Sequence, residues 1–305
     1  MPENTVSLGC KKKLRRYYSN IGTVSEILAH TNTPRGTFAS VRNVPELQFF
    51  KERKMIALLA NAGGTLAALS SDWTQNTPLQ SITLYLFFAG TVAMGAGAAY
   101  FLLMRNNVDV AYRSTMVCAG LVCGIACFHY FKMTHVYQES GGQFPTALRY
   151  IDWLFTTPLM LIKFPLLLRL GDKGKKFFVQ LVTLDIGMIV CAFIAETSPV
   201  ASTSWWGFFL VACVLELLIV ATLYTGLGSA IGEAPAPLAK ALNTMRLFIL
   251  IGWAIYPLGF LMAYGGLGEV REIFYNVADV INKVGFGLAA YWGIEALSHS
   301  SRQTA

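Results

Sequence analysis

Ionisable side chains lie inside apolar stretches of this sequence, where such residues are costly and usually serve a function. The two lysines among them, Lys163 and Lys283, matter most, because a lone lysine is a poor structural device in lipid. A lysine amine forms Schiff bases with carbonyl compounds, and burial can remove its proton. These residue types therefore indicate proton transfer and covalent binding of a carbonyl compound. The set comprises Arg149, Asp152, Lys163, Asp185, Glu216, Asp279 and Lys283, with His129 on another apolar stretch and Glu196 near the end of one.

The spacing of these residues places them on two helical faces. Asp279 and Lys283 are four positions apart and share one face. A second face carries residues separated by 3, 4 and 7 positions, which are Arg149, Asp152, Thr156 and Lys163. The two faces carry opposite charges, which predicts that they meet inside a bundle. The alternative is that buried ion pairs only fix the register of the helices.

The composition indicates a membrane protein. Of the 305 residues, 54% are hydrophobic and only 13% are charged, about half the charged share of a soluble domain. The mean hydropathy is +0.50, and a soluble protein this apolar could not cover its surface. These values exclude disordered, collagen-like and coiled-coil proteins. Six cysteines in a chain of this length provide no disulfide framework.

Seven apolar segments reach the length of about 20 residues that a membrane-crossing helix needs. We therefore predict an all-α membrane protein, a bundle of seven transmembrane helices. Turn residues mark short connections at 139–142, 171–174, 198–199 and 265–266, and the longest connection spans about 226–237. The predicted helices cover approximately 80–104, 114–136, 146–168, 177–197, 204–225, 242–265 and 270–296.

Basic residues orient the predicted bundle. Connections 1–2, 3–4 and 5–6 contain eight Lys and Arg residues, whereas the other connections have only Lys132 and Arg271 at their margins. The positive-inside rule then places the first set, and the C-terminus, in the cytoplasm.

The first 55 residues differ from the rest, with ten Lys or Arg against four Glu. Seven helices with this orientation place the start of the first helix outside the cell, where so basic a segment is not expected. The conflict disappears if residues 55–71 are a cleaved signal or an additional span. We predict a basic, disordered or targeting segment at 1–54, a signal-like or surface apolar segment with a linker at 55–79, a seven-helix domain at 80–297 and a cytoplasmic tail at 298–305.

Three motifs in order carry a family resemblance. Arg149–Leu159 reads RYIDWLFTTPL, Gly252–Pro257 reads GWAIYP and Asp279–Phe286 reads DVINKVGF. Together they resemble the microbial rhodopsins, and most closely the proteorhodopsin-like proton pumps. The resemblance runs from about residue 80 to 297 and leaves out residues 1–79.

The resemblance implies a role for each motif residue. Lys283 would hold all-trans retinal covalently as a protonated Schiff base. Asp152 would be its main counterion and proton acceptor, Asp279 the second counterion, and His129 the partner of Asp152. Arg149 and Thr156 would belong to the proton pathway. The retinal pocket would include Trp153, Pro158, Met160, Trp253, Tyr256 and Pro257, and the apolar Met160 predicts absorption of green rather than blue light.

Lys163 departs from the usual family pattern, which has Glu or Asp there as the cytoplasmic proton donor. A lysine resembles the less common lysine-donor branch. Eleven residues separate Asp152 from Lys163, or about 16 Å along a helix, so the two flank the Schiff base. Burial disfavours a charged lysine. We therefore expect Lys163 to be neutral at rest, and to take up a cytoplasmic proton and pass it on.

The resulting prediction is a light-driven outward proton pump and not an enzyme. Its expected partners are membrane lipid, protons and other copies of the chain, with no nucleic acid and no metal. We expect a multi-pass protein of the plasma membrane, with an organelle membrane as the alternative. A sensory photoreceptor or a light-gated ion channel with the same chromophore remains open. Asp185 is expected to make a structural hydrogen bond, and no role is assigned to Glu216.

Overall fold

The computed structural model describes residues 77–303, all of them helical or in short connections. The predicted segment 1–54 and residues 55–76 lie outside the described residues. Two short helices, η3 (Val110–Tyr112) and α10 (Gly228–Gly232), lie in connections. Seven crossing segments are formed by α4 (Pro78–Met104), α5 (Arg113–Glu139), α6 (Thr146–Leu161) with α7 (Lys163–Leu167), α8 (Gly171–Thr197), α9 (Thr203–Gly226), α11 (Ala236–Leu247) with η4 (Phe248–Gly252) and α12 (Ile255–Tyr264), and α13 (Gly268–Val280) with η5 (Ile281–Gly285) and α14 (Phe286–Gln303).

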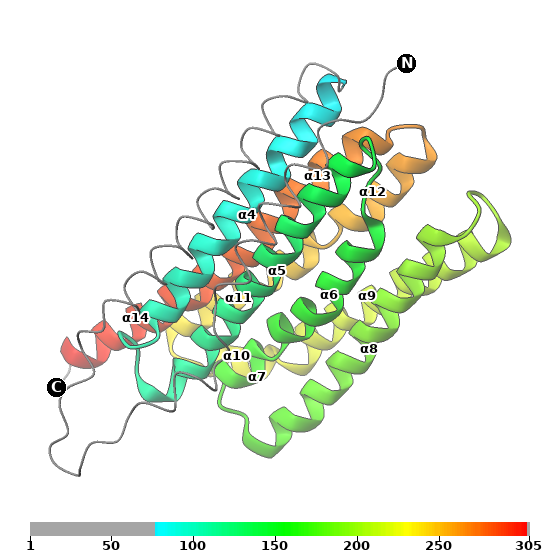
Figure 1. The fold of residues 1–305 in the computed structure, drawn as a ribbon. Helices are drawn as coiled ribbons and strands as arrows, with labels where there is room; N and C mark the ends of the chain where they lie inside the picture. The colour runs from blue at the N-terminus through cyan, green and yellow to red at the C-terminus, as the bar shows by residue number, and fades with distance from the viewer. Residues whose placement is uncertain (1–76, 304–305) are drawn as a thin grey trace, which may run out of the picture. The chain divides into compact units, whose positions relative to one another are not determined.

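The crossing segments pack side by side, mostly with their neighbours in the chain (Figure 1). Helix α4 packs on α5, α5 on α6, α6 on α8 and α8 on α9, while α11 packs on α14 and α13 returns to α4. Within the described residues, five helical segments are long and apolar enough to span a membrane. The predicted all-α, seven-helix membrane fold is thus confirmed. Following the loop charges, we name the end with connections 140–145, 198–202 and 265–267 the outer end and the opposite end the inner end.

Two predicted helix starts were wrong by six residues. Helix α8 begins at Gly171 rather than 177, so the predicted turn at 171–174 is its first helical turn. The actual turn precedes it and holds Arg169 in the left-handed region, at φ 53°. Asp172 suits this first turn because a carboxylate is favourable at a helix N-terminus. Helix α11 begins at Ala236 rather than 242, and its first turn tolerates Pro237 because the N–H groups there have no helical partner.

The third crossing segment, predicted as one helix over 146–168, is interrupted at Ile162. Pro165 causes the break, because it has no N–H to bond the carbonyl of Leu161 and its ring crowds that carbonyl. The chain then continues as α7, whose first residue is Lys163. A proline thus positions this lysine at a local irregularity of the helix.

The sixth and seventh segments each contain a π-helical turn, a feature often found at functional sites. These turns, η4 and η5, are linked through Asn282 of η5, whose Nδ2 donates to the carbonyl of Gly252 at 2.9 Å. A side chain at Gly252 would overlap that amide, so this close approach requires glycine. The contact holds the backbone of Lys283 against the sixth segment.

Candidate functional site

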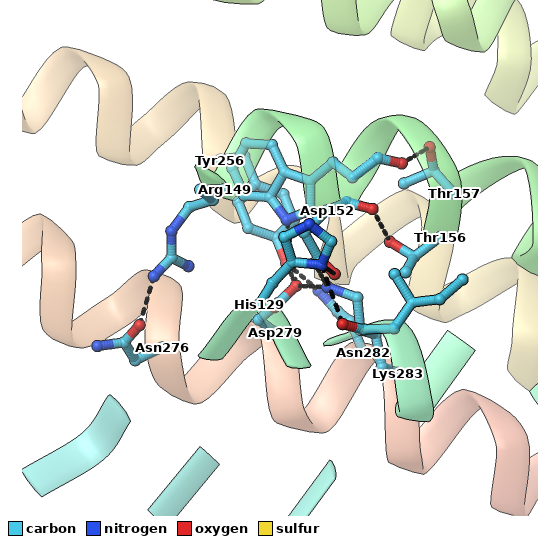
Figure 2. Close-up of polar contacts among 12 residues, drawn as sticks. His129, Arg149, Asp152, Thr156, Thr157, Tyr256, Asn276, Asp279, Asn282 and Lys283 are labelled. Carbon is cyan, nitrogen blue, oxygen red and sulfur yellow. Dashed lines mark hydrogen bonds and ion pairs between the residues drawn. The ribbon is translucent and has the colours of Figure 1, made fainter. Parts of the chain in front are cut away.

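An ion triad of Lys283, Asp152 and Asp279 forms the centre of the bundle (Figure 2). The Nζ of Lys283 lies 2.7 Å from Oδ2 of Asp152 and also donates to Oδ1 of Asp279. Each of the three residues is at most 2% exposed. Helix α6 supplies Asp152, whereas α13 and η5 supply the other two. The two faces predicted from sequence spacing therefore meet.

His129 of α5 lies beside Asp152, with Nδ1 3.5 Å from Oδ1 of the carboxylate. The same nitrogen lies 3.0 Å from the carbonyl oxygen of Ile125. Because a carbonyl only accepts, we assign the proton of a neutral ring to Nδ1. The imidazole then covers one oxygen of Asp152 that has no other hydrogen-bond partner among the described residues.

Aromatic residues hold Asp279 in place. Trp153 Nε1 donates to Oδ1 of Asp279 at 3.2 Å, and the Tyr256 hydroxyl donates to the same oxygen at 3.3 Å. Asn282 in turn donates to the Tyr256 hydroxyl at 3.3 Å. The carboxylate beside Lys283 is therefore oriented from α6 and α12 as well as from its own helix.

The two predicted pathway residues, Arg149 and Thr156, make no hydrogen bond to the carboxylate of Asp152 among the described residues. Arg149 donates to Oδ1 of Asn276 and lies 4.6 Å from the ring of Phe144, and within residues 77–303 it forms no ion pair with Asp152. Thr156 donates at 2.8 Å to the backbone carbonyl of Asp152 and not to its carboxylate. Arg149 nevertheless lies one turn outward from Asp152, as the spacing predicted (Figure 2).

An apolar cavity is bordered by two residues of the triad, Lys283 and Asp279. Five of the six predicted pocket residues line it, namely Trp153, Met160, Trp253, Tyr256 and Pro257. Pro158 does not, because it lies five positions after Trp153 on a helix of 3.6 residues per turn. The remaining lining is also largely apolar or aromatic, including Met188, Ile189, Phe209, Phe260 and Tyr275. A hydrophobic polyene attached to the Lys283 amine fits this lining.

Two further carboxyl groups lie near the cavity. Asp185 of α8 is fully buried and accepts a hydrogen bond of 2.8 Å from Thr157, which is the structural role expected for it. Glu216 of α9 lines the cavity directly, an outcome that the sequence did not predict.

Lys163 differs from the triad in having no polar partner. Its side chain is fully buried, and Nζ has no hydrogen-bond partner within the described part of the chain. The nearest charge-stabilising group is the ring of Phe286, whose centroid lies 4.9 Å from Nζ. An amine in such surroundings is disfavoured in its charged form.

A second polar cluster, which the sequence did not predict, lies at the outer end. Arg271 bonds Glu196 at 2.7 Å and Glu272 at 2.6 Å, joining α8 to α13. The hydroxyl of Tyr150 donates to the other oxygen of Glu196 at 2.8 Å, which adds α6. The three charged side chains are 6–12% exposed. We call these four residues the outer cluster.

Comparison with known proteins agrees with this geometry. The family model for bacteriorhodopsin-like proteins matches residues 81–295. The green-light absorbing proteorhodopsin of Gamma-proteobacterium EBAC31A08 is 34% identical over 221 residues, covering 70% of this chain and 86% of that protein. The crystal structure of Exiguobacterium sibiricum rhodopsin aligns with a TM-score of 0.69 and 41% identity, covering 73% and 99% of the two chains. Xanthorhodopsin, described as a light-driven ion pump with dual chromophore, aligns with a TM-score of 0.68 and 28% identity, covering 74% and 98%.

Proposed function

The chain belongs to the bacteriorhodopsin-like family of microbial rhodopsins, which are transporters rather than enzymes, and we propose that it is a light-driven outward proton pump. The family implies a retinal chromophore. The observation that carries the proposal is the Lys283 amine, buried between two carboxylates at the end of an apolar cavity. Xanthorhodopsin, a structural relative of this chain, is described as a light-driven ion pump, which supports the same reading.

The cavity residues would hold all-trans retinal covalently on Lys283. Bound there as a protonated Schiff base, retinal would supply light absorption and a photoisomerisation that lowers the proton affinity of the Lys283 nitrogen. Trp153 and Tyr256 would then have two functions, since both line the cavity and both donate to Asp279. Met160 gives the cavity an apolar wall, which supports absorption in the green.

Asp152 would accept the proton from the Lys283 nitrogen, because its Oδ2 lies at hydrogen-bond distance. Its other oxygen, Oδ1, faces Nδ1 of His129, which would stabilise the ionised form of Asp152 by donating to it. Asp279, held by Trp153 and Tyr256, would stay ionised as the second counterion. One carboxylate is thus free to change its protonation, whereas the other is fixed by donors.

Lys163 would return a proton to the Lys283 nitrogen from the inner side. It lies eleven residues after Asp152 along the same crossing segment, on the side that the loop charges assign to the cytoplasm. Since no polar group bonds its amine within the described part of the chain, we expect the side chain to be neutral at rest. It would therefore take a proton from the inner end during each cycle and transfer it outward, as proposed for a lysine donor.

The test is the pH of an unbuffered suspension of expressing cells supplied with retinal, in light and in the dark. We expect light to acidify the medium reversibly, and a protonophore to abolish the change. Cells that express Lys283→Ala should be colourless and give no signal. A coloured protein without acidification would contradict pumping. A photocycle of seconds would then indicate a sensor, and a current that reverses with voltage would indicate a channel.

A further inference from the structure

The surroundings of Lys163 raise the question of what stabilises its ammonium form when it is charged. No carboxylate forms an ion pair with it in the part of the chain that the structure describes, and its amine has no hydrogen-bond partner there. The titratable groups that act on it are two thiols of α5, Cys118 and Cys123. Neutral thiols are weak acceptors and offer little to a cation.

One aromatic face remains. The Nζ of Lys163 lies 4.9 Å from the centroid of the Phe286 ring, within the range of a cation–π contact. Both residues are fully buried, so water does not screen this contact. Such contacts are strongest when the cation is desolvated.

The position of Phe286 links this contact to the triad. Phe286 follows Lys283 by three residues, directly after the π-helical turn η5. Its ring also meets two other rings edge-on, Phe164 of α7 at 5.9 Å and Phe248 of η4 at 6.2 Å between centroids. Phe248 packs against the backbone of η5 at Gly285, where a side chain would clash. The ring that faces Lys163 therefore packs within one connected set of contacts with η5, which carries Lys283.

We propose that Phe286 is a positioning residue for Lys163, whose ring face stabilises the ammonium form and couples it to the conformation of η5 at Lys283. The inference deepens the proposed function and rests on it for the donor role of Lys163. Phe164 and Phe248 hold the ring in place but do not themselves bind the amine. The consequence is that the readiness of Lys163 to take up a proton depends on one aromatic ring.

The experiment compares Phe286→Leu, Phe286→Tyr and the control Phe274→Leu, on the same crossing segment, in the full chain with retinal bound. After a flash, the return of the proton to the Lys283 nitrogen is followed by absorbance as a function of pH. In Phe286→Leu we expect the midpoint of this pH profile to move about one unit lower, with the return about tenfold slower near neutral pH. Phe286→Tyr keeps the ring face and should restore the profile, and Phe274→Leu, which changes an exposed ring of α13, should leave the midpoint in place.

Two further measurements separate a specific effect from a structural one. In a Lys163→Ala background, Phe286→Leu should have no additional effect, because the residue it acts through is missing. Nitrogen NMR of the Lys163 amine in the dark protein should show the same shift of about one unit in Phe286→Leu.

An unmoved midpoint in Phe286→Leu, or an equal effect with and without Lys163, would overturn the inference. If Lys163→Ala alone leaves the return rate unchanged, the donor role fails instead. The NMR midpoint then still decides whether the ring stabilises the ammonium.

Discussion

The outer and inner halves of the bundle interior are built on opposite principles. On the outer side of Lys283, charged groups are paired or hydrogen-bonded, from Asp152 through Arg149 to the outer cluster. On the inner side, Lys163 is enclosed by Phe164, Phe286 and the α5 thiols without a hydrogen-bond partner among the described residues. Both sites are buried, but the surroundings of Asp152 are polar, whereas those of Lys163 are largely apolar.

The contrast explains how a proton could be given a direction. In the outer half, a proton that leaves Lys283 meets an ionised acceptor at hydrogen-bond distance in the resting state. In the inner half, Lys163 has no hydrogen-bond partner among residues 77–303, so we expect the path for proton uptake to form during the cycle. Uptake from the inner side would then wait for a structural change.

Removing the acceptor tests the outer half with the largest expected effect. Asp152→Asn should abolish light-driven acidification, because the amide cannot accept the proton and one counterion of Lys283 is lost. The matched control is Asp185→Asn, which removes an equally buried carboxyl that bonds Thr157 and should retain transport. Light-induced pH change and flash absorbance both report the result. If Asp152→Asn still pumps protons, another group must be the proton acceptor.

Removing the donor tests the inner half and should slow the cycle without stopping it. Lys163→Ala should delay the return of the proton to Lys283 about 100-fold, a typical contribution of a positioned acid. The exposed Lys175→Ala, whose ion pair with Asp172 is at the surface, is the control. Added small amines or weak acids should partly restore the rate. An unchanged return rate in Lys163→Ala would remove the proposed difference between the halves.

The outer cluster should matter more for stability than for chemistry. Arg271→Gln leaves the carboxylates of Glu196 and Glu272 buried and without their cation, which should destabilise the protein by about 3 kcal/mol. Thermal unfolding in detergent measures the loss. The loss should shrink at lower pH, because a protonated carboxyl no longer needs a cation. A loss that does not depend on pH would show that packing, and not charge, holds the outer end.

The residues of the triad could be predicted from the sequence because charges stand out in apolar helices. Asp152, Asp279 and Lys283 follow helical spacing, so their two faces had to meet. The outer cluster could not be predicted in the same way. Glu196 and Arg271 lie near helix ends, where charged residues are ordinary and indicate no partner.

The cavity-lining residues of α8 and α9 could not be predicted from the sequence for a different reason. These helices are apolar on every side, because one side faces the bundle and the other faces lipid. Met188, Phe209 and Glu216 therefore carry no periodic signal that separates the cavity face from the lipid face. The helix start at Gly171 was missed because the first turn of α8 is polar, and the start at Ala236 because Pro237 was assigned to the preceding connection.

The smallest predicted effect concerns the hydrogen bond from Thr157 of α6 to Asp185 of α8. Thr157→Val keeps the shape of the side chain but leaves Asp185 without a partner, since its other oxygen already has none among the described residues. The expected cost is about 1 kcal/mol of unfolding free energy. Thr183→Val on α8 is the control, because that exposed hydroxyl bonds only its own helix. If the loss is as large as that of Arg271→Gln, the Thr157–Asp185 hydrogen bond stabilises the protein as strongly as the ion pairs of the outer cluster do. The two regions would then differ in their chemistry but not in their contribution to stability.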